Sequence, residues 1–477
     1  MSLKKKAVKG FFWTFLEKFS SKFISFSVSI LLARLILPKE FGLLGLIYLF
    51  TGISTVLINS GLSNSLIRSK NLRNDDYSTV FYFNILLSFL IYTLLFFTAP
   101  FIADYYEQDQ LTLIIRLYTL TFIFDAFGSI QKTILTIELD FKRQMTVTLP
   151  ALIISSCVSL IMAYLEYGVW SLVWGAITYS FIVSAQYWFY SNWRPNFVFN
   201  KTKFNRHFKF GYKLTLAGLV NIIFNNIYYI ILGKYFSINQ VGYYQRAESL
   251  KDMPVSSLSL VLDKVTFPIF SKMQDNPLQL KRAYQDIMQL VIFVIAPTMA
   301  ILIVVSNTLF VTLYTEKWLP AAPLFQIMAI ASILYPIQVY NVNILKVKGR
   351  SDLIFKVVLL VRLSSLALLY LAFDYGVYVL VFTQVIIAIL FFLIYSFFSG
   401  RLINYSTWEQ IKDIAPSILL TICMALGLHF LYINILHLNN ILVLLITCVS
   451  GYGIYFILAK LFKMKSLGII KNLILKR

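Results

Sequence analysis

Long apolar segments separated by short polar loops make up most of this chain of 477 residues. About 20 apolar residues in a helix are enough to cross the ~30 Å hydrocarbon core of a bilayer. The pattern therefore predicts an all-α polytopic membrane protein with about 14 transmembrane helices. The expected spans are residues 11–37, 41–62, 79–103, 112–137, 145–165, 168–190, 211–236, 249–270, 284–306, 319–345, 353–373, 376–398, 414–434 and 439–461.

Two segments, 11–42 and 211–242, have a polar stripe along an otherwise apolar helix. The polar positions recur at i, i+4, i+7 and i+11, which is one helix face. In the first segment they are Lys18, Lys22, Ser25 and Ser29. In the second they are Gly218, Asn221, Asn225 and Tyr229. A polar face is unfavourable toward lipid, so we expect both stripes to face protein or water.

The two striped segments align with each other at a constant shift of 200 residues, which places Leu32 on Leu232 and Gly42 on Gly242. This echo predicts two six-helix lobes. Because six is even, both lobes would insert with the same orientation, related by a pseudo-two-fold axis along the membrane normal. The expected parts are an N-terminal lobe, a cytoplasmic connector, a C-terminal lobe, and a C-terminal helix pair with a basic tail: 1–193, 194–210, 211–400 and 401–477.

Basic residues recur in every second loop, which is the pattern that orients membrane proteins. The N-terminal lysines and the connector 194–210 belong to this basic set, whereas the intervening loops are short and weakly charged or acidic. The pattern predicts that the chain is a multi-pass membrane protein with both termini in the cytoplasm. It also accounts for the net charge of +21, so we expect no nucleic-acid partner.

Sequence motifs for catalysis or metal binding are lacking. There is no GxxxxGK[ST], HExxH or CxxC pattern, and the three cysteines lie in apolar segments. His207, His429 and His437 are scattered along the chain and are interpreted as unpaired. We therefore expect a protein that is not an enzyme, with no metal site and no cofactor other than H+ or Na+ as a coupling ion.

Polar residues inside the spans are the candidate site, because a charge at mid-bilayer costs about 2.5–3.5 kcal/mol. The basic ones would form a cationic cavity for an anionic substrate, although lysines near helix ends could instead snorkel to the headgroups. These basic residues are Lys18, Lys22, Arg116 and Lys132. A second set would line the cavity with polar groups, or equally would join helices by hydrogen bonds. That set is Ser25, Asn59, Asn221, Asn225 and Asn341. Asp125 is either a cation-coupling site or the partner of a lysine such as Lys22.

Two stretches resemble a known family. LLARLILPKEFGLLGL at 31–46, and VGYYQRAESLKDMP at 241–254 followed by FPIFSKMQDN at 267–276, look like bacterial polysaccharide flippases of the Wzx type. These belong to the multidrug/oligosaccharidyl-lipid/polysaccharide exporter superfamily. The arrangement of six, six and two spans is similar over the full length.

The resemblance implies a flippase that moves oligosaccharide repeat units on undecaprenyl diphosphate across the bacterial cytoplasmic (inner) membrane. The product would be O-antigen lipopolysaccharide, capsule or exopolysaccharide. Alternating access, coupled to a proton or sodium gradient, would drive the transfer. Implied partners are membrane lipids, the lipid-linked oligosaccharide, a polysaccharide polymerase and glycosyltransferases, and the chain would be a monomer. The alternative is a cation-coupled drug exporter on the same fold. A membrane-embedded polymerase is disfavoured because the expected outward loops are short.

Overall fold

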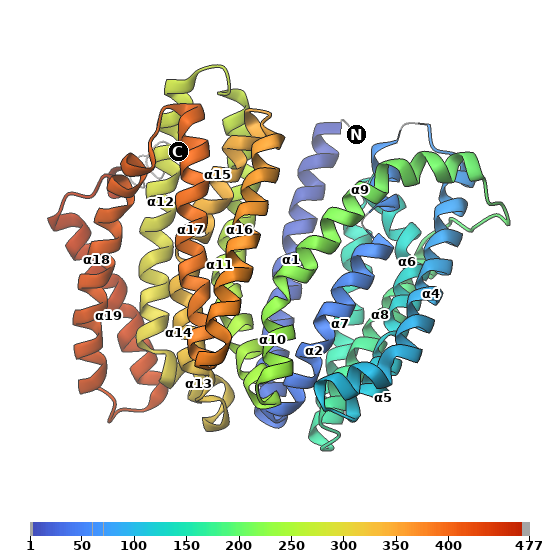
Figure 1. Cartoon of the computed structure of the whole chain (residues 1–477), viewed down its shortest axis with the longest axis horizontal. Coiled ribbons are helices and arrows are strands. Elements are labelled where there is room, and N and C mark those ends of the chain that lie inside the picture. The colour runs from blue at the N-terminus through green and yellow to red at the C-terminus, as the bar shows by residue number, and fades with distance from the viewer. Residues whose placement is uncertain (1–2, 60, 70, 470–477) are drawn as a thin grey trace. The chain divides into compact units, whose positions relative to one another are not determined.

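The computed structural model describes residues 3–59, 61–69 and 71–469. Within them every regular element is a helix, so the all-α fold class is confirmed. The chain divides into two compact units, Met1–Gly242 and Tyr243–Arg477. Figure 1 labels most of the helices of each unit.

The first unit contains the helices up to the start of α11. They are α1 (Leu3–Leu35), α2 (Pro38–Asn59), α3 (Leu62–Arg68), α4 (Asn74–Tyr106), α5 (Gln110–Tyr118), α6 (Leu120–Ile137), α7 (Phe141–Tyr164), α8 (Val169–Tyr190), α9 (Lys201–Asn225), α10 (Ile227–Tyr235) and the first residues of α11 (Ile238–Lys272).

The second unit contains the rest of α11 and the helices that follow. They are α12 (Pro277–Val304), α13 (Ser306–Tyr314), η1 (Glu316–Trp318), α14 (Ala321–Ser332), α15 (Tyr335–Val347), α16 (Ser351–Ala372), η2 (Phe373–Tyr375), α17 (Val377–Ile403), α18 (Thr407–Asn434) and α19 (Asn440–Leu461).

Each of the expected spans lies on one of these helices or on two consecutive ones. In the described residues, 11 helices are long and apolar enough to cross a membrane, or 12 if the bent pair α9 and α10 is one span. Helices α1 and α11 are also long, but they contain more polar and charged residues and are not in this count. The count of fourteen and the lobe boundaries therefore stay predictions.

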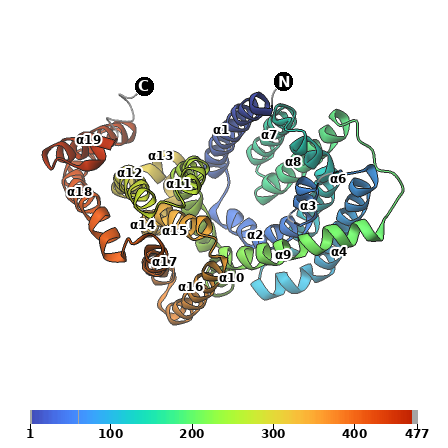
Figure 2. The same cartoon turned by 90° about the horizontal axis from the view of Figure 1, so that it is seen from above.

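In the first unit α1 packs against α7, α7 against α8, and α8 against α6, while α9 crosses α2 and α3 (Figure 2). Glycines allow the α2 and α9 backbones to approach closely. A Cβ on Gly52 would lie 2.7 Å from the Ile222 side chain, and one on Gly218 would lie 2.7 Å from Val56. Small residues at such crossings increase van der Waals contact, which is what holds helices together in a bilayer.

The span that contains α9 and α10 is broken, with a bend of 42° between the two helices. The break falls at the asparagine pair Asn225 and Asn226. A break frees backbone carbonyls that must find another donor in a membrane. At this break Asn226 bonds to the last turn of α9 twice: its backbone N–H donates to the Ile222 carbonyl at 3.0 Å, and its side-chain amide donates to the same carbonyl at 2.9 Å.

In the second unit the C-terminal helices α18 and α19 pack on α12. Their shared core includes Phe293, Met424 and Tyr455. At one end, the Lys281 ammonium of α12 lies 2.9 Å from a Glu409 carboxylate oxygen of α18. The C-terminal helix pair is therefore built into this unit by both apolar and polar contacts.

Candidate functional site

The basic stripe of α1 is exposed. Lys18, Lys22 and Ser25 all lie on the accessible side of the helix, whereas the neighbouring Glu17 is buried. The Thr148 hydroxyl of α7 donates to Glu17 at 3.3 Å. Helix α1 therefore turns a carboxylate toward α7 and presents its lysines on another face. The sequence did not single out Glu17 as a site residue.

Arg116 of α5 has a structural role that the sequence did not indicate. It is half-buried, its Nε donates to the Phe96 carbonyl at 3.1 Å, and its guanidinium lies 4.3 Å from the centre of the Phe96 ring. Pro100 lies within α4 and has no N–H, so the carbonyl four residues earlier, that of Phe96, lacks its helical donor. Arg116 supplies the missing hydrogen bond.

Asp125 and Lys132 are brought together on α6. Both are exposed, and they interact electrostatically across two helical turns. Asp125 also forms a side-chain hydrogen bond with Ser180 of α8. The hydroxyls of Tyr118 and Tyr179 interact electrostatically with the same carboxylate. The result is an accessible carboxylate with a hydroxyl ligand and several polar neighbours, which are groups suited to holding a proton or a small cation.

The expected polar lining falls in different places. The Asn59 side chain lies outside the described residues. Asn221 and Asn225 are exposed on α9 in the first unit. Asn341 of the second unit is buried between α15 and α17, where the Ser399 hydroxyl donates to its Oδ1. The lining role of these residues stays a prediction.

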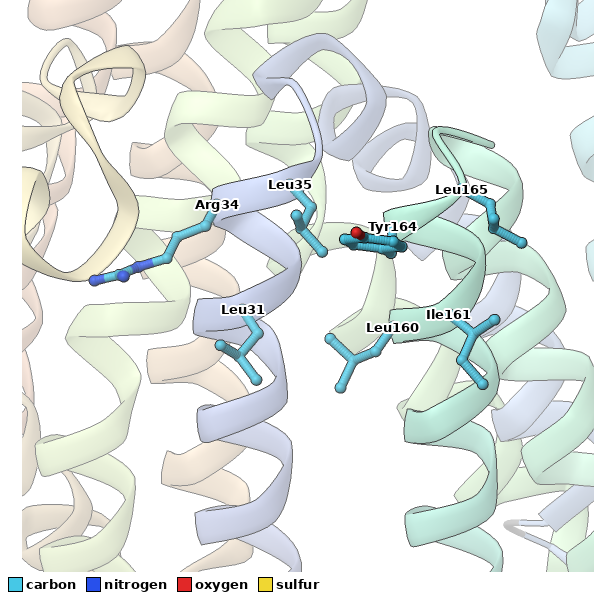
Figure 3. Close-up of a pocket in the computed structure, with 7 residues that line it drawn as sticks. All are labelled: Leu31, Arg34, Leu35, Leu160, Ile161, Tyr164 and Leu165. Carbon is cyan, nitrogen blue, oxygen red and sulfur yellow. The ribbon is translucent and has the colours of Figure 1, made fainter.

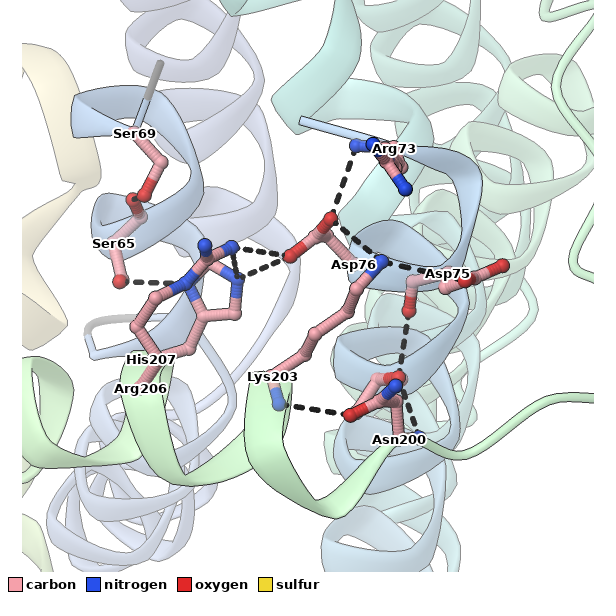
Figure 4. A network of polar contacts seen from close by, with 10 residues as sticks. Ser65, Ser69, Arg73, Asp75, Asp76, Asn200, Lys203, Arg206 and His207 are labelled. Carbon is pink, nitrogen blue, oxygen red and sulfur yellow. Dashed lines mark hydrogen bonds and ion pairs between the residues drawn. The ribbon is translucent and has the colours of Figure 1, made fainter. Parts of the chain in front are cut away.

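A buried polar network that sequence reasoning missed connects α3, α4 and α9 (Figure 4). The Ser65 Oγ lies 2.8 Å from His207 Nδ1, and His207 Nε2 lies 3.2 Å from an Asp76 carboxylate oxygen. A carboxylate only accepts, so Nε2 donates to Asp76 and Nδ1 accepts from the serine hydroxyl. The interpretation of His207 as unpaired is therefore wrong.

Two cationic side chains of α9 complete this network. Lys203 Nζ lies 3.1 Å from Asp76 Oδ2, and Arg206 pairs with the other oxygen. Ser65, His207 and Asp76 are all buried, so this serine–histidine–aspartate set is inaccessible to a substrate and serves as a helix connector. No periodicity could reveal it, because the partners are about 130 residues apart along the chain.

The second unit contains a buried arginine that the sequence placed in a loop. Arg246 of α11 is 2% exposed, and its guanidinium lies 5.2 Å from the Tyr314 ring centre and 5.4 Å from that of Trp318. The expected span began at residue 249, but α11 begins at Ile238. Several of the residues just before 249 are polar or charged. A prediction based on hydropathy alone therefore places the start of this helix too far along the chain.

A pocket of about 470 Å³ lies between the ends of α1 and α7 (Figure 3). Its lining residues are Leu31, Arg34, Leu35, Leu160, Ile161, Tyr164 and Leu165. The Arg34 side chain leads away from the space between the two helices. The pocket surface is apolar, so it suits hydrocarbon and has no hydrogen-bond partners for a sugar.

Comparison with known proteins places the chain. A family model described as "Polysaccharide biosynthesis protein" matches residues 31–323, which is more than half of the chain. Among similar proteins, the teichuronic acid biosynthesis protein TuaB of Bacillus subtilis is 25% identical over 74% of this chain and 74% of its own length. The lipopolysaccharide biosynthesis protein WzxC of Escherichia coli is 22% identical over 75% of this chain and 73% of its own.

Solved structures give the fold. The lipid II flippase MurJ in an inward closed conformation superposes with a TM-score of 0.79 at 16% identity, covering 96% of this chain and 100% of that one. An inward-facing MATE-family multidrug transporter has a TM-score of 0.61 at 16% identity, covering 81% and 96%. The chain is thus a multi-pass helical membrane protein with a MurJ-like fold. It belongs to the polysaccharide biosynthesis protein family, and the resemblance drawn from the sequence is confirmed.

Proposed function

We propose that this protein is a flippase for oligosaccharide repeat units carried on undecaprenyl diphosphate, and that it acts in surface polysaccharide biosynthesis. Membership of the polysaccharide biosynthesis family is the observation on which this proposal mainly rests. The MurJ-like fold supports it, because that neighbour is itself named as a lipid II flippase. Transport by alternating access, rather than catalysis, is the proposed activity.

The accessible lysines of α1 support an anionic substrate. Lys18 and Lys22 are exposed on one helix beside Ser25, in a segment that is mainly apolar. A diphosphate group would gain charge-assisted hydrogen bonds from two ammonium groups in such a setting. Arg116 is less suited to this role than the sequence indicates, because its guanidinium already serves the Phe96 carbonyl.

Replacement of Lys22 tests the proposal. In cells that depend on this chain for surface polysaccharide, Lys22→Ala should abolish the polymer and leave the amount of protein in the membrane unchanged. The matched control is Lys39→Ala, which removes an exposed lysine at the start of α2, outside the stripe. Normal polymer in the Lys22 variant, or equal loss in the Lys39 variant, would contradict the proposal. Arg116→Ala should lower both polymer and thermal stability, so it is a less specific test.

The coupling ion is a second part of the proposal. We place it at Asp125, where Ser180 supplies a hydroxyl and Lys132 a competing positive charge. A cation that binds the carboxylate would release Lys132 from its electrostatic partner, which gives the ion gradient a way to alter the site. Glu17, buried against Thr148, is a further carboxylate in the same unit.

The alternative is a cation-coupled drug exporter, favoured by the likeness to a multidrug MATE transporter. Asp125→Asn separates the two. A flippase that uses this carboxylate should lose polysaccharide export and show no change in drug resistance. An exporter should lose resistance to cationic drugs while polysaccharide remains normal. Both effects are read from the same strain, against Asp374→Asn as a control for loss of one carboxylate from η2.

The remaining parts of the proposal concern the setting. We place the chain in the bacterial cytoplasmic membrane as a monomer with both termini in the cytoplasm. Glycosyltransferases would supply its lipid-linked substrate, and a polysaccharide polymerase would use its product. The presence of several polysaccharide biosynthesis proteins among its relatives supports this context.

A further inference from the structure

The basic residues in the first turns of α9 have two different environments. Lys203 and Arg206 face α4 and are neutralised there by Asp76, with Lys203 also 3.3 Å from Asp75. Three other lysines are exposed and have no ion pair or hydrogen bond within the part of the chain that the structure describes. They are Lys201, Lys209 and Lys213.

A row of aromatic rings runs along the same turns. Phe204, Phe208 and Tyr212 follow at four-residue spacing, with ring centres 5.3 Å and 5.9 Å apart and nearly parallel planes. Phe208 is 43% exposed and Tyr212 is 39% exposed. In the connector before α9, Phe197 is 99% exposed. The three rings thus form a continuous aromatic surface, and part of this surface is exposed.

The aromatic row and Lys201 lie on one side of the face that packs on the protein, and Lys209 and Lys213 lie on the other side. His207 marks that packed face. At about 100° per residue, Phe208 lies roughly 100° from it in one direction, and Lys213 lies roughly 120° from it in the other. A helix with an aromatic flank and a basic flank is typical of segments that lie in the plane of a membrane surface.

We propose that this exposed side of α9, formed by Lys201, Phe208, Lys209, Tyr212 and Lys213, is a binding surface for anionic phospholipid headgroups. Aromatic rings prefer the boundary between headgroups and acyl chains. Ammonium groups pair with lipid phosphates, and the net negative charge of an anionic lipid distinguishes it from a zwitterionic one. Asp76 binds the packed side of α9 through ion pairs and hydrogen bonds, and anionic lipid binds the exposed side.

Titration of the purified full-length chain with lipid, followed by native mass spectrometry, tests this inference. Wild-type protein should retain phosphatidylglycerol in preference to phosphatidylcholine. Replacing the three lysines by glutamine (K201Q, K209Q and K213Q together) should weaken phosphatidylglycerol binding about fivefold per lysine, as expected for lysines near a charged surface. Phosphatidylcholine binding should not change.

The control variant removes the same number of charges elsewhere. Lys272, Lys346 and Lys460 are exposed lysines of the second unit, and their combined replacement by glutamine should leave phosphatidylglycerol binding as in the wild type. Equal losses in the two triple variants, or unchanged binding in the α9 variant, would overturn the inference. The F208S/Y212S variant should weaken retention of both lipids and leave the preference intact, because it removes apolar adhesion without removing charge. Thermal unfolding of every variant ensures that only folded protein is compared.

Discussion

Asp76 connects two helices through a single buried carboxylate. Its Oδ2 accepts the Arg73 backbone N–H at 3.0 Å, so Asp76 helps to cap the N-terminus of α4. The same side chain receives His207, Lys203 and Arg206 from α9. A negative charge is also favoured at a helix N-terminus by the macrodipole. Loss of this charge would leave several cationic or polar partners unsatisfied at once.

Asp76→Asn should therefore lower the free energy of unfolding by about 3 kcal/mol, the cost of breaking a buried ion pair from one side. Thermal unfolding of the detergent-solubilised chain measures the loss. Asp75→Asn is the matched control. Its side chain is 40% exposed and pairs with Lys203 alone in this network, so the change should be under about 1 kcal/mol. Equal destabilisation by the two variants would show that burial does not set the strength of this contact.

Arg116 illustrates what a polar pattern can and cannot predict. Hydropathy correctly places Arg116 within the helical part of a span, and intramembrane charge makes it a candidate site residue. Its partner is a backbone carbonyl. Every residue has one, so the residue type at position 96 does not mark it as the partner. A signal was nevertheless present, since Pro100 marks the Phe96 carbonyl as lacking a donor. A proline inside a predicted span is thus a reason to look for a nearby side-chain donor.

At the scale of helices, α2 and α11 begin with a reciprocal contact. A Cβ on Gly42 would lie 2.1 Å from the Ile238 carbonyl oxygen, and one on Gly242 would lie 2.0 Å from that of Pro38. Residue 42 thus contacts residue 238, and residue 38 contacts residue 242. Adding 200 to the α2 member of one contact gives the α11 member of the other. A two-fold axis produces this kind of self-complementary contact. Positions that are equivalent in the sequence repeat are thus in contact through their backbones.

Gly42→Ala should be poorly tolerated, because the neighbour at 2.1 Å is backbone and cannot rotate away. We expect a loss of about 1–3 kcal/mol in stability from overpacking, together with reduced polysaccharide export. Gly453→Ala in α19 is the control, since a Cβ there would meet nothing within 4 Å. That variant should be neutral or slightly stabilising, as alanine favours helix. Thermal unfolding and polymer content provide the two measurements, and wild-type values for Gly42→Ala would refute the steric argument.

A second correspondence concerns two ion pairs between helices. An alignment that counts identical residues does not detect it, because the residue types differ. The ion pair between Asp75 of α4 and Lys203 of α9 has a counterpart in Lys281 of α12 and Glu409 of α18. Both members are displaced by 206 residues, and acid and base have changed places. The N-caps Asn200 and Ser406 keep the same displacement. In each case the ion pair joins the third span of a predicted lobe to the helix that follows that lobe, α9 after the first and α18 after the second.

At the scale of the whole molecule, apolar windows were sufficient to place a helix at every expected span, because lipid requires long apolar segments. They were not sufficient to locate breaks. The expected span 112–137 is two helices that meet at Thr119, whose hydroxyl donates to the Ile115 carbonyl at 2.7 Å. A local side-chain bond of this kind alters helix geometry without altering mean hydropathy. Contacts between distant helices, such as His207 with Asp76, were beyond the reach of periodicity for the same reason.

The orientation can be measured directly. In a chain whose three cysteines are replaced, Asn205→Cys on α9 should react with an impermeant thiol reagent only after the cells are permeabilised. Gln110→Cys at the start of α5 should react in intact cells. Both positions are exposed, so accessibility to the reagent is set by the membrane rather than by burial. The reverse pattern would place the basic loops outside and contradict the orientation predicted from charge.

The reciprocal glycine crossing also has a historical implication. Two separate copies of a half-length protein, facing the same way in a bilayer, would form such a crossing as a homodimer. Duplication and fusion of one gene would then convert an interface between subunits into a contact within one polypeptide. On that account, Gly42 and Gly242 descend from one position of the half-length protein. A side chain at that position would have clashed with the backbone of the other subunit.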